Sequence, residues 1–409
     1  MERVVITGMG AITPVGNDVP SFWESLKTGK CGIGPITKFD VSDFKVKLGA
    51  EVKDFDPTQY MEKRDARRAD ANVHYAMAAA IQAVEQAGLK EGNFDPYRTG
   101  VIFGSGVGGL HIAEQEVPKL LEKGPGRVSP FAIPEMIANI AAAYISMHFG
   151  FKGENFCPVS ACATGNHSIG EAMRAIRHGY QDVVVCGGTE NGIIPISMAG
   201  FQNMKAVHMG EDPTAASIPF DARRSGFVMG EGAGCLVLES LTHAQQRGAT
   251  ILAEVAGYGA SGDAYHITSP SPDGEAAAHV IRGAIEDAGL TPADVDYINA
   301  HGTSTPLNEK YETIAIKKAF GDEAYNVKVS STKSMTGHLL GGAAAVEAIA
   351  CVMAIREGIV PPTIGYKEPD PECDLDITPN KAVEMPINVA ISNSLGFGGH
   401  NACILIKKV

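Results

Sequence analysis

Short runs of consecutive apolar residues recur along the chain, and each run ends in a turn rich in glycine. Alanine-rich segments with apolar residues at helical spacing separate these runs. Continuous apolar strands that alternate with helices are typical of a sheet buried on both faces, so the pattern predicts an α/β fold. The runs are RVVITGMG (3–10), TGVIFGSGVGG (99–109), DVVVCGGTE (182–190), GCLVLES (234–240), VDYINAHGTS (295–304) and NVAISNSLGFGG (388–399).

A short internal repeat suggests that the fold is duplicated. AVEQAGL (83–89) resembles AIEDAGL (284–290), and each closes a helical pattern that is followed about ten residues later by an apolar strand. The offset between the copies is near half of the 409-residue chain. We therefore expect two related α/β halves, residues 1–250 and 251–409, although chance similarity between alanine-rich helices would also give such a match.

Composition and charge argue against several classes of function. Hydrophobic residues make up 44% of the chain and charged residues 20%, which is typical of a globular protein with a large core. The formal net charge of −13 argues against general binding to nucleic acid or to an anionic membrane. No apolar run reaches the ~18 residues that a membrane span needs. The first residues enter a strand pattern without the layout of a signal peptide, so a cytoplasmic location is expected.

Cysteine spacing and two short motifs give weaker signals. None of the eight cysteines forms a CxxC pair, so neither a metal site nor a disulfide framework is expected. GSGVGG (104–109) fits the dinucleotide pattern GxGxxG, but the segment after it is not a short route to a second parallel strand. Close backbone packing, or a loop beside a substrate tunnel, is the favoured interpretation. EPDPECDLD (368–376) lacks the Gly and Glu spacing of a calcium loop and is interpreted as a solvated acidic loop.

The strongest candidate for chemistry is Cys162, in the segment VSACATGNHSIGEA (159–172). Small residues flank it, and the residues that follow have apolar positions at helical spacing, with Gly179 as the expected helix cap. A cysteine at a helix N-terminus lies near backbone amides and the helix dipole, which stabilise a thiolate. The alternative is an unreactive cysteine that only packs.

A cysteine nucleophile needs polar partners from the ends of other strands, and two later segments offer them. AHGTSTP (300–306) places His301 after an apolar strand, and STKSMTGHLLGGAAAVEAI (331–349) places Lys333 and His338 in a polar turn before a helix. Glu347 lies among Ala and Val on that helix, so we expect it to be buried and paired. Each residue alone has a structural explanation, but together with Cys162 they suit chemistry that develops negative charge on oxygen.

These segments resemble those of the β-ketoacyl-acyl-carrier-protein synthases of the thiolase superfamily, and the resemblance runs the whole chain. The family implies a duplicated fold stacked in αβαβα layers, usually assembled as a homodimer. Many ordered motifs at compatible spacing make the resemblance specific. Besides the segments around Cys162, His301 and His338, the motifs are ITGMGAITPVG (6–16), FGSGVGGL (103–110), PFDARRSGFVMGEGAG (219–234), YHITSPSPDG (265–274), VPPTI (360–364) and NSLGFGGHNA (393–402).

The family resemblance implies a decarboxylative condensation. Cys162 would take an acyl chain from a carrier-protein thioester, and His301 and His338 would hold the thioester carbonyl of malonyl-acyl-carrier protein as it loses carbon dioxide. The resulting carbanion equivalent would attack the acyl-cysteine and give a 3-oxoacyl product. Lys333 and Glu347 would form a pair that orients these groups rather than acting as direct acid and base.

The resemblance also implies residues that bind substrate. The backbone N–H groups of Cys162 and Phe397 would form a second oxyanion hole, and Phe397 would act as a gate on a flexible loop that includes Gly398. No cofactor is required, while a structural monovalent cation near Asn393 and Glu347 is left open. The other residues expected to contact substrate are Val107, Thr303 and Thr305.

Acyl carrier protein is the implied partner, and because carrier proteins are acidic they suit a basic docking surface. The segment EKRDARR (62–68) concentrates basic residues in an acidic chain and matches the docking region of the family. A solvated helix face balanced by neighbouring acids is the alternative. The expected docking residues are Lys63, Arg64, Arg67, Arg68 and Lys205.

Three positions depart from the family pattern. Leu395 stands where Phe is often found, Asn308–Glu309 where Gly–Asp is common, and Ser225 where Asp is common. None of them belongs to the Cys–His–His set. Three alternatives remain: a polyketide-type ketosynthase, a non-catalytic chain-length subunit, and a cysteine hydrolase. The presence of Cys162 argues against the chain-length subunit, and the two histidines argue against the hydrolase.

Overall fold

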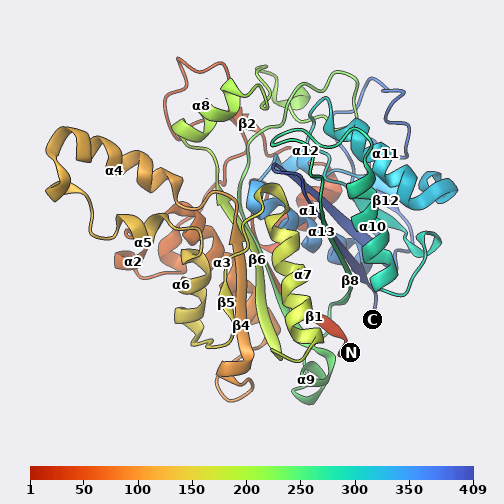
Figure 1. Ribbon diagram of the computed structural model, residues 1–409, viewed down its shortest axis with the longest axis horizontal. Helices are drawn as coiled ribbons and strands as arrows, with labels where there is room; N and C mark the ends of the chain where they lie inside the picture. Colours follow the sequence, from red (N-terminus) through yellow and green to blue (C-terminus); the bar gives the residue numbers. More distant parts are fainter.

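One mixed sheet of ten strands runs through the computed structural model, which describes residues 1–409 (Figure 1). Outward from its centre, each half of the sheet makes two antiparallel pairings and then two parallel ones. The two halves therefore have the same topology. From edge to edge the order is β10 (Lys328–Ser330), β9 (Tyr297–Asn299), β13 (Val389–Gly396), β14 (His400–Lys407), β8 (Ala253–Gly262), β1 (Val4–Ile12), β7 (Glu231–Ser240), β6 (Val183–Asn191), β4 (Thr99–Ser105) and β5 (Asn155–Phe156).

The two central strands join the halves into one sheet. β1 pairs antiparallel with β8 at only two positions, Val5 opposite Glu254 and Ile6 opposite Ala253. The predicted α/β fold with two related halves is confirmed. The pairing between the halves is a feature that the sequence pattern did not reveal. The boundary at residue 250 stays a prediction.

The two halves of the sheet form two layers, and helices form three more: one outside each half and one between them (Figure 1). α3 (Ala71–Ala87) and α6 (Ile140–Phe149) pack on the outer face of the N-terminal half. α10 (Glu275–Asp287), with α11 (Asn308–Phe320) against it, packs on the outer face of the C-terminal half. α7 (Thr164–Arg177) and α13 (Ala343–Glu357) lie in the middle and contact strands of both halves, so the αβαβα order is confirmed.

Burial on both faces explains the continuous apolar runs in the sequence. Along β4, Ile102 packs in the core that contains α7, whereas Val101 packs in the core that contains α3. Neighbouring residues of a strand point to opposite faces, so a strand between two helical layers is apolar at every position. α13 is buried almost all round for the same reason, since it lies between the two halves of the ten-stranded sheet.

The remaining elements connect these layers, and α4 and α5 project from one side of the molecule (Figure 1). None of the helices combines the length and the apolar character that a membrane span requires. These elements are α1 (Val19–Thr28), β2 (Gly34–Pro35), β3 (Leu48–Gly49), α2 (Lys63–Ala66), α4 (Leu110–Lys123), α5 (Ala132–Met136), η4 (Ala161–Ala163), α8 (Pro195–Asn203), α9 (Leu241–Gln246), α12 (Lys333–Thr336), η8 (Leu340–Gly342), β11 (Ile359–Val360) and β12 (Val383–Glu384).

Candidate active site

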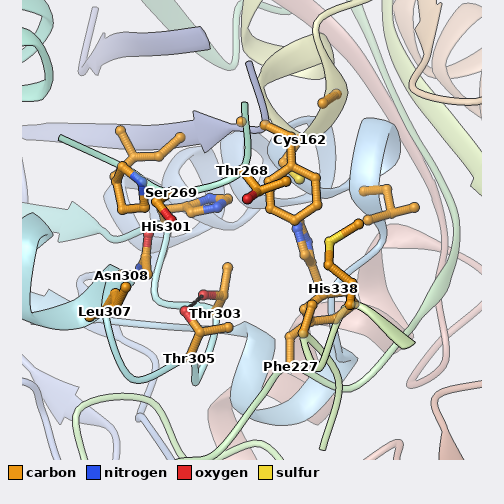
Figure 2. Close-up of a pocket in the computed structure, with 18 of the residues that line it drawn as sticks. Cys162, Phe227, Thr268, Ser269, His301, Thr303, Thr305, Leu307, Asn308 and His338 are labelled. Carbon is orange, nitrogen blue, oxygen red and sulfur yellow. Dashed lines mark hydrogen bonds between the residues drawn. The ribbon is translucent and has the colours of Figure 1, made fainter. Parts of the chain in front are cut away.

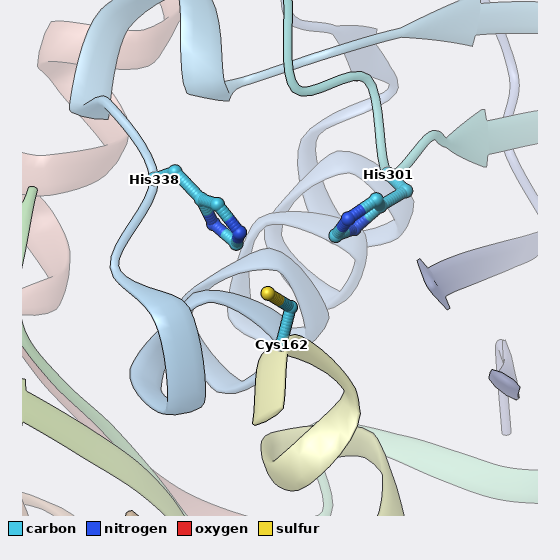
Figure 3. Close-up of side chains that lie close together, drawn as sticks. All are labelled: Cys162, His301 and His338. Atoms are coloured by element: carbon cyan, nitrogen blue, oxygen red, sulfur yellow. The ribbon is translucent and has the colours of Figure 1, made fainter. Parts of the chain in front are cut away.

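Residues from both halves line a cavity of about 430 Å³ (Figure 2). Cys162, His301 and His338 all belong to its wall and are buried, with 7%, 2% and 3% of their surface exposed. The sulfur of Cys162 and one ring nitrogen from each histidine lie within 4.8 Å of one another (Figure 3). The two imidazole rings are 5.4 Å apart between centroids and nearly perpendicular. Three residues far apart in the sequence thus meet at one point.

The ends of buried elements position these three side chains. Cys162 lies in η4, immediately before α7, and His301 follows β9. His338 lies between α12 and η8, where its N–H donates to the Val228 carbonyl at 2.7 Å and its carbonyl accepts from Gly230 at 2.9 Å. The helix expected after Cys162 is present, and Gly179 follows its end with a positive φ of 77°.

Backbone strain is concentrated beside the same three side chains. Ala161, Ser304 and Leu340 have φ values of 51°, 70° and 46°, and each lies within three residues of Cys162, His301 or His338. Residues other than glycine adopt this left-handed region only when the surrounding packing holds them there. The turns that carry the candidate residues are therefore rigidly held.

Cys162 lies at a helix N-terminus as expected, but its burial opposes the thiolate that such a position favours. Burial raises the pKa of Cys162 to about 12 and outweighs the opposing effects of Lys333 and of the Phe397 and Cys162 N–H groups. The contact between the Phe397 loop and the cysteine turn is close. A Cβ on Gly396 would lie 2.7 Å from the Ser160 carbonyl oxygen, so only glycine fits there.

Both histidines are neutral at neutral pH. Burial lowers the pKa of His301 and of His338 well below the usual value, and the positive charge of Lys333 lowers both further. A neutral imidazole has one N–H donor and one lone pair. Each ring can therefore donate a hydrogen bond to an oxygen atom in the cavity, or accept a proton from the nearby thiol.

Lys333 and Glu347 form a buried ion pair, as the sequence predicted, and each side chain is only 1% exposed. Burial raises the pKa of Glu347 to about 7, against the effect of the Lys333 charge. Neither side chain lines the cavity. The pair therefore influences the cavity through its charge and packing rather than by contact with a substrate.

Glu190 is a buried carboxylate that the sequence analysis missed. It accepts hydrogen bonds from the Ser105 hydroxyl (2.8 Å) and from the N–H groups of Gly106 (2.8 Å), Val107 (3.2 Å) and Gly341 (3.1 Å). It thus ties the GSGVGG turn to the turn after His338. The close-packing interpretation of that motif holds, because a Cβ on Gly106 would lie 2.7 Å from a Glu190 oxygen.

The predicted substrate-binding residues divide into two groups. Val107, Thr303, Thr305 and Phe397 line the cavity. Gly398 does not line it: it is exposed, and its N–H donates to the Ile267 carbonyl at 2.7 Å, so its contact with substrate stays a prediction. The glycine-rich loop turns away from the cavity after Phe397.

The predicted docking residues are exposed but do not form one patch at the cavity. Lys205 follows α8 and lines the cavity wall. The other basic side chains belong to α2 or follow it, and they do not line the cavity. Figure 1 shows α2 and α8 in different parts of the molecule. The exposed α2 residues are Lys63, Arg64, Arg67 and Arg68.

Oxygen atoms around Glu347 fit the ligand chemistry of a monovalent cation. Glu347 Oε2, Asn393 Oδ1, Asn299 Oδ1 and the Ser392 hydroxyl are buried and have no hydrogen-bond partner. Asn299 and Ser392 lie opposite each other on β9 and β13, whereas Asn393, the next residue of β13, points to the other face of the sheet, so the cation expected near Asn393 would be held by its neighbours. Buried oxygens without donors are the groups that would hold a cation of this kind. Asn299 and Ser392 were not singled out from the sequence.

Family models match most of the chain. The β-ketoacyl synthase N-terminal domain matches residues 1–244, and the β-ketoacyl synthase C-terminal domain matches residues 252–367. The chain belongs to the β-ketoacyl synthase family. A protein named 3-oxoacyl-[acyl-carrier-protein] synthase 2 from Synechocystis sp. is 52% identical over 408 residues, which cover 100% of this chain and 98% of the relative. The proteins of the same name from Staphylococcus aureus and Coxiella burnetii are 49% identical over 407 residues and 48% identical over 409 residues, and the alignments cover 100% of this chain and 98% and 99% of those proteins.

Solved β-ketoacyl synthase structures have the same fold. A ketosynthase of a type II polyketide system, in complex with its acyl carrier protein, matches with a TM-score of 0.93 and 34% identity over 100% of both chains. The ishigamide ketosynthase/chain length factor matches with a TM-score of 0.93 and 37% identity over 100% of this chain and 99% of that one. Because both matches cover the whole of this chain, the similarity includes both halves of the fold.

Proposed function

We propose that this β-ketoacyl synthase catalyses the decarboxylative condensation of malonyl-acyl-carrier protein with an acyl chain on Cys162. The product is 3-oxoacyl-acyl-carrier protein, formed in type II fatty-acid elongation. The observation that carries the proposal is the meeting of the Cys162 sulfur with the His301 and His338 rings in one cavity. Relatives named 3-oxoacyl-[acyl-carrier-protein] synthase 2, at 48–52% identity, support it.

Acylation of Cys162 comes first. Its sulfur attacks the thioester carbonyl, the bond between the acyl carbon and the carrier sulfur breaks, and an acyl–sulfur bond to Cys162 forms. Because the thiol is protonated at rest, a neutral imidazole accepts its proton and passes it to the carrier thiol. The N–H groups of Cys162 and Phe397 are the donors for the oxyanion that develops.

Decarboxylation then uses the two histidines as hydrogen-bond donors. The bond between the malonyl carboxylate and the α-carbon breaks, carbon dioxide leaves, and the electron pair moves to the thioester oxygen as an enolate. His301 and His338 stabilise that oxygen most strongly when its charge is fully developed, because their N–H groups are already fixed in a buried site.

Condensation returns the enzyme to its starting state. The enolate carbon attacks the acyl carbonyl, a carbon–carbon bond forms, and the bond to the Cys162 sulfur breaks. The thiolate that leaves takes up one proton, so each turnover consumes one proton. The Lys333 charge, which lowers the pKa of Cys162, stabilises this thiolate.

The proposal includes acyl carrier protein as partner, a homodimer as assembly and a cytoplasmic location. A solved ketosynthase in complex with its carrier protein supports the first of these. The reaction requires no redox cofactor. A monovalent cation held by Glu347, Asn299 and Ser392 would supply a fixed positive charge that stabilises the ionised Glu347 carboxylate.

A polyketide-type ketosynthase is the second candidate, because solved polyketide ketosynthases share the fold. Identity favours fatty-acid elongation: it is 48–52% with the proteins named synthase 2, against 34% and 37% with the two polyketide structures. Analysis of the products after repeated elongation separates the two, since a polyketide enzyme would extend a chain that keeps its oxo groups.

The test is the intact mass of the protein after incubation with long-chain acyl-acyl-carrier protein, with Cys162→Ala as the control. We expect an acyl adduct on the native chain and none on the variant. Adding malonyl-acyl-carrier protein should discharge the adduct as a 3-oxoacyl product. A folded native chain that forms no adduct at several chain lengths would instead indicate a non-catalytic chain-length subunit.

A further inference from the structure

Two carboxylates in the first turns of α11 hold the loop that carries His301. Glu312 accepts hydrogen bonds from the backbone N–H groups of His301 at 2.7 Å and of Gly302 at 2.8 Å. Glu309 accepts one from the N–H of Ser304 at 2.8 Å. Both carboxylates are buried, with 0% of Glu309 and 1% of Glu312 exposed. The position of the His301 ring therefore depends on both of them.

Asn308 places an amide between these two carboxylates. Its Nδ2 lies 3.2 Å from Glu309 Oε1 and 3.2 Å from Glu312 Oε2. The side chain is 6% exposed and lines the cavity, and Figure 2 shows it close to the turn of His301. An amide nitrogen has two N–H groups, so one side chain can donate to both carboxylates at once without adding a charge.

The charges around this bridge do not remove the repulsion between the carboxylates. Burial, with a smaller contribution from the Glu312 charge, raises the pKa of Glu309 to about 7, and burial raises the pKa of Glu312 above its usual value. Arg224 Nε lies 3.1 Å from Glu309 Oε2, but Arg224 also pairs with Asp370 at 2.6 Å. The titratable groups that interact with the two carboxylates are Arg224, Lys333 and Cys373, and Asp370 pairs with the same Arg224.

We propose that Asn308 is a positioning residue for decarboxylation, because its amide bridges Glu309 and Glu312 and so keeps the His301 loop in place. The inference rests on the proposed function only for the reaction that it assigns to His301. Asn308 and Glu309 are adjacent at the start of α11, so the bridging amide and one of the carboxylates that it joins come from the same turn.

The decisive variant is Asn308→Asp, which keeps the size of the side chain and replaces its donor by a third carboxylate. Decarboxylation of malonyl-acyl-carrier protein should slow roughly tenfold at pH 8, because two buried acceptors lose their donor and gain a like charge. At pH 6 the loss should be smaller, since one protonated carboxyl group again supplies a donor. The KM for the carrier substrate should not change, and the acylation of Cys162, which His301 or His338 assists only by accepting the thiol proton, should slow less than decarboxylation.

A matched control makes the same exchange on the surface. Asn326 Nδ2 donates to Glu323 at 2.9 Å, and Asn326 is exposed. Asn326→Asp should therefore leave the rate unchanged from pH 6 to pH 8. Equal pH profiles for Asn308→Asp and the native enzyme would overturn the inference. A native enzyme that does not decarboxylate at all would instead overturn the proposed function.

A second pair of variants keeps the inference testable if Asn308→Asp does not fold. Asn308→Gly removes both donors without adding charge and should lower the decarboxylation rate. Combining it with Glu309→Asp, which shortens one of the two carboxylates left without the amide, should recover part of that rate. The Glu309→Asp single variant is measured as well. If the rate of the double variant is reduced by the product of the two single reductions, the residues act independently, and that result would also overturn the inference.

Discussion

The two halves of the molecule share a strand order but place different chemistry in the cavity. α7 begins just after Cys162 in the N-terminal half, and α13 begins just after His338 in the C-terminal half. The two helices pack together in the middle layer, so the turns before them meet. Duplication thus explains why the residues converge, while the difference between the halves explains the reaction: one supplies a nucleophile and the other supplies fixed polar groups.

The two halves also differ in the charged groups that they place next to these catalytic candidates. Small uncharged residues flank Cys162, and burial keeps its thiol protonated. The C-terminal half buries an ion pair and two further carboxylates beneath its histidines. Decarboxylation should therefore depend mainly on the C-terminal half, whereas acylation also requires the nucleophile of the N-terminal half. Four predictions test this division.

The largest expected effect comes from removing a histidine. His301→Ala or His338→Ala should slow decarboxylation of malonyl-acyl-carrier protein by roughly 100- to 1000-fold, as the loss of one fixed donor does in other oxyanion holes. Acylation of Cys162, followed by intact mass, should fall much less. His279→Ala, an exposed histidine on α10, is the control. If both variants decarboxylate normally, the assignment of roles to the halves is wrong.

Breaking the ion pair should destabilise the fold. Lys333→Ala leaves Glu347 buried without its partner, which should lower the free energy of unfolding by about 3–5 kcal/mol. Urea unfolding followed by circular dichroism measures the change. The double variant Lys333→Met with Glu347→Leu should be less destabilised, because it buries no unpaired charge. If Lys333→Ala unfolds like the native chain, the pair contributes nothing to stability.

The thiol should react with iodoacetamide as a buried, protonated group. Since burial raises the pKa of Cys162 to about 12, the thiolate fraction should rise about tenfold per pH unit between pH 7 and pH 10. The alkylation rate, measured by mass of the modified peptide, should follow without a plateau. A plateau near pH 7 would indicate a preformed thiolate that the N-terminus of α7 stabilises.

The smallest effect is expected at the docking residues. Lys205→Glu should raise the KM for carrier-linked substrate about two- to fivefold, in keeping with the weakness of exposed charge pairs. Small-molecule thioesters should be used nearly as before, because Lys205 is an exposed part of the cavity wall and does not belong to the cluster of Cys162, His301 and His338. Arg67→Glu with Arg68→Glu tests the separate α2 cluster. Equal effects on both kinds of substrate would exclude docking as the explanation.

The sequence predicted the layers and the central residues because both leave local signals. Apolar strands between alanine-rich helices require a doubly covered sheet, and Cys162, His301 and His338 each lie where a strand or turn gives way to a helix or loop. The family resemblance then supplied their roles, which stay predictions until variants are assayed.

Features that depend on packing between distant segments could not be predicted. Glu190 and Glu312 look like ordinary acids in the sequence, and only the fold brings backbone N–H groups against them. The pKa of Cys162 depends on how completely the Phe397 loop and the histidine turns exclude water. The position of Gly398 depends on its hydrogen bond to Ile267, which lies in another loop.

The short pairing between β1 and β8 predicts how the protein behaves when the chain is divided into its two halves. Because these strands pair at only two positions, the halves are joined chiefly through the apolar faces of α7 and α13. A chain cut between α9 and β8 would leave each fragment with a large uncovered apolar surface. The two pieces would aggregate when expressed alone, but would reassemble by fragment complementation when expressed together.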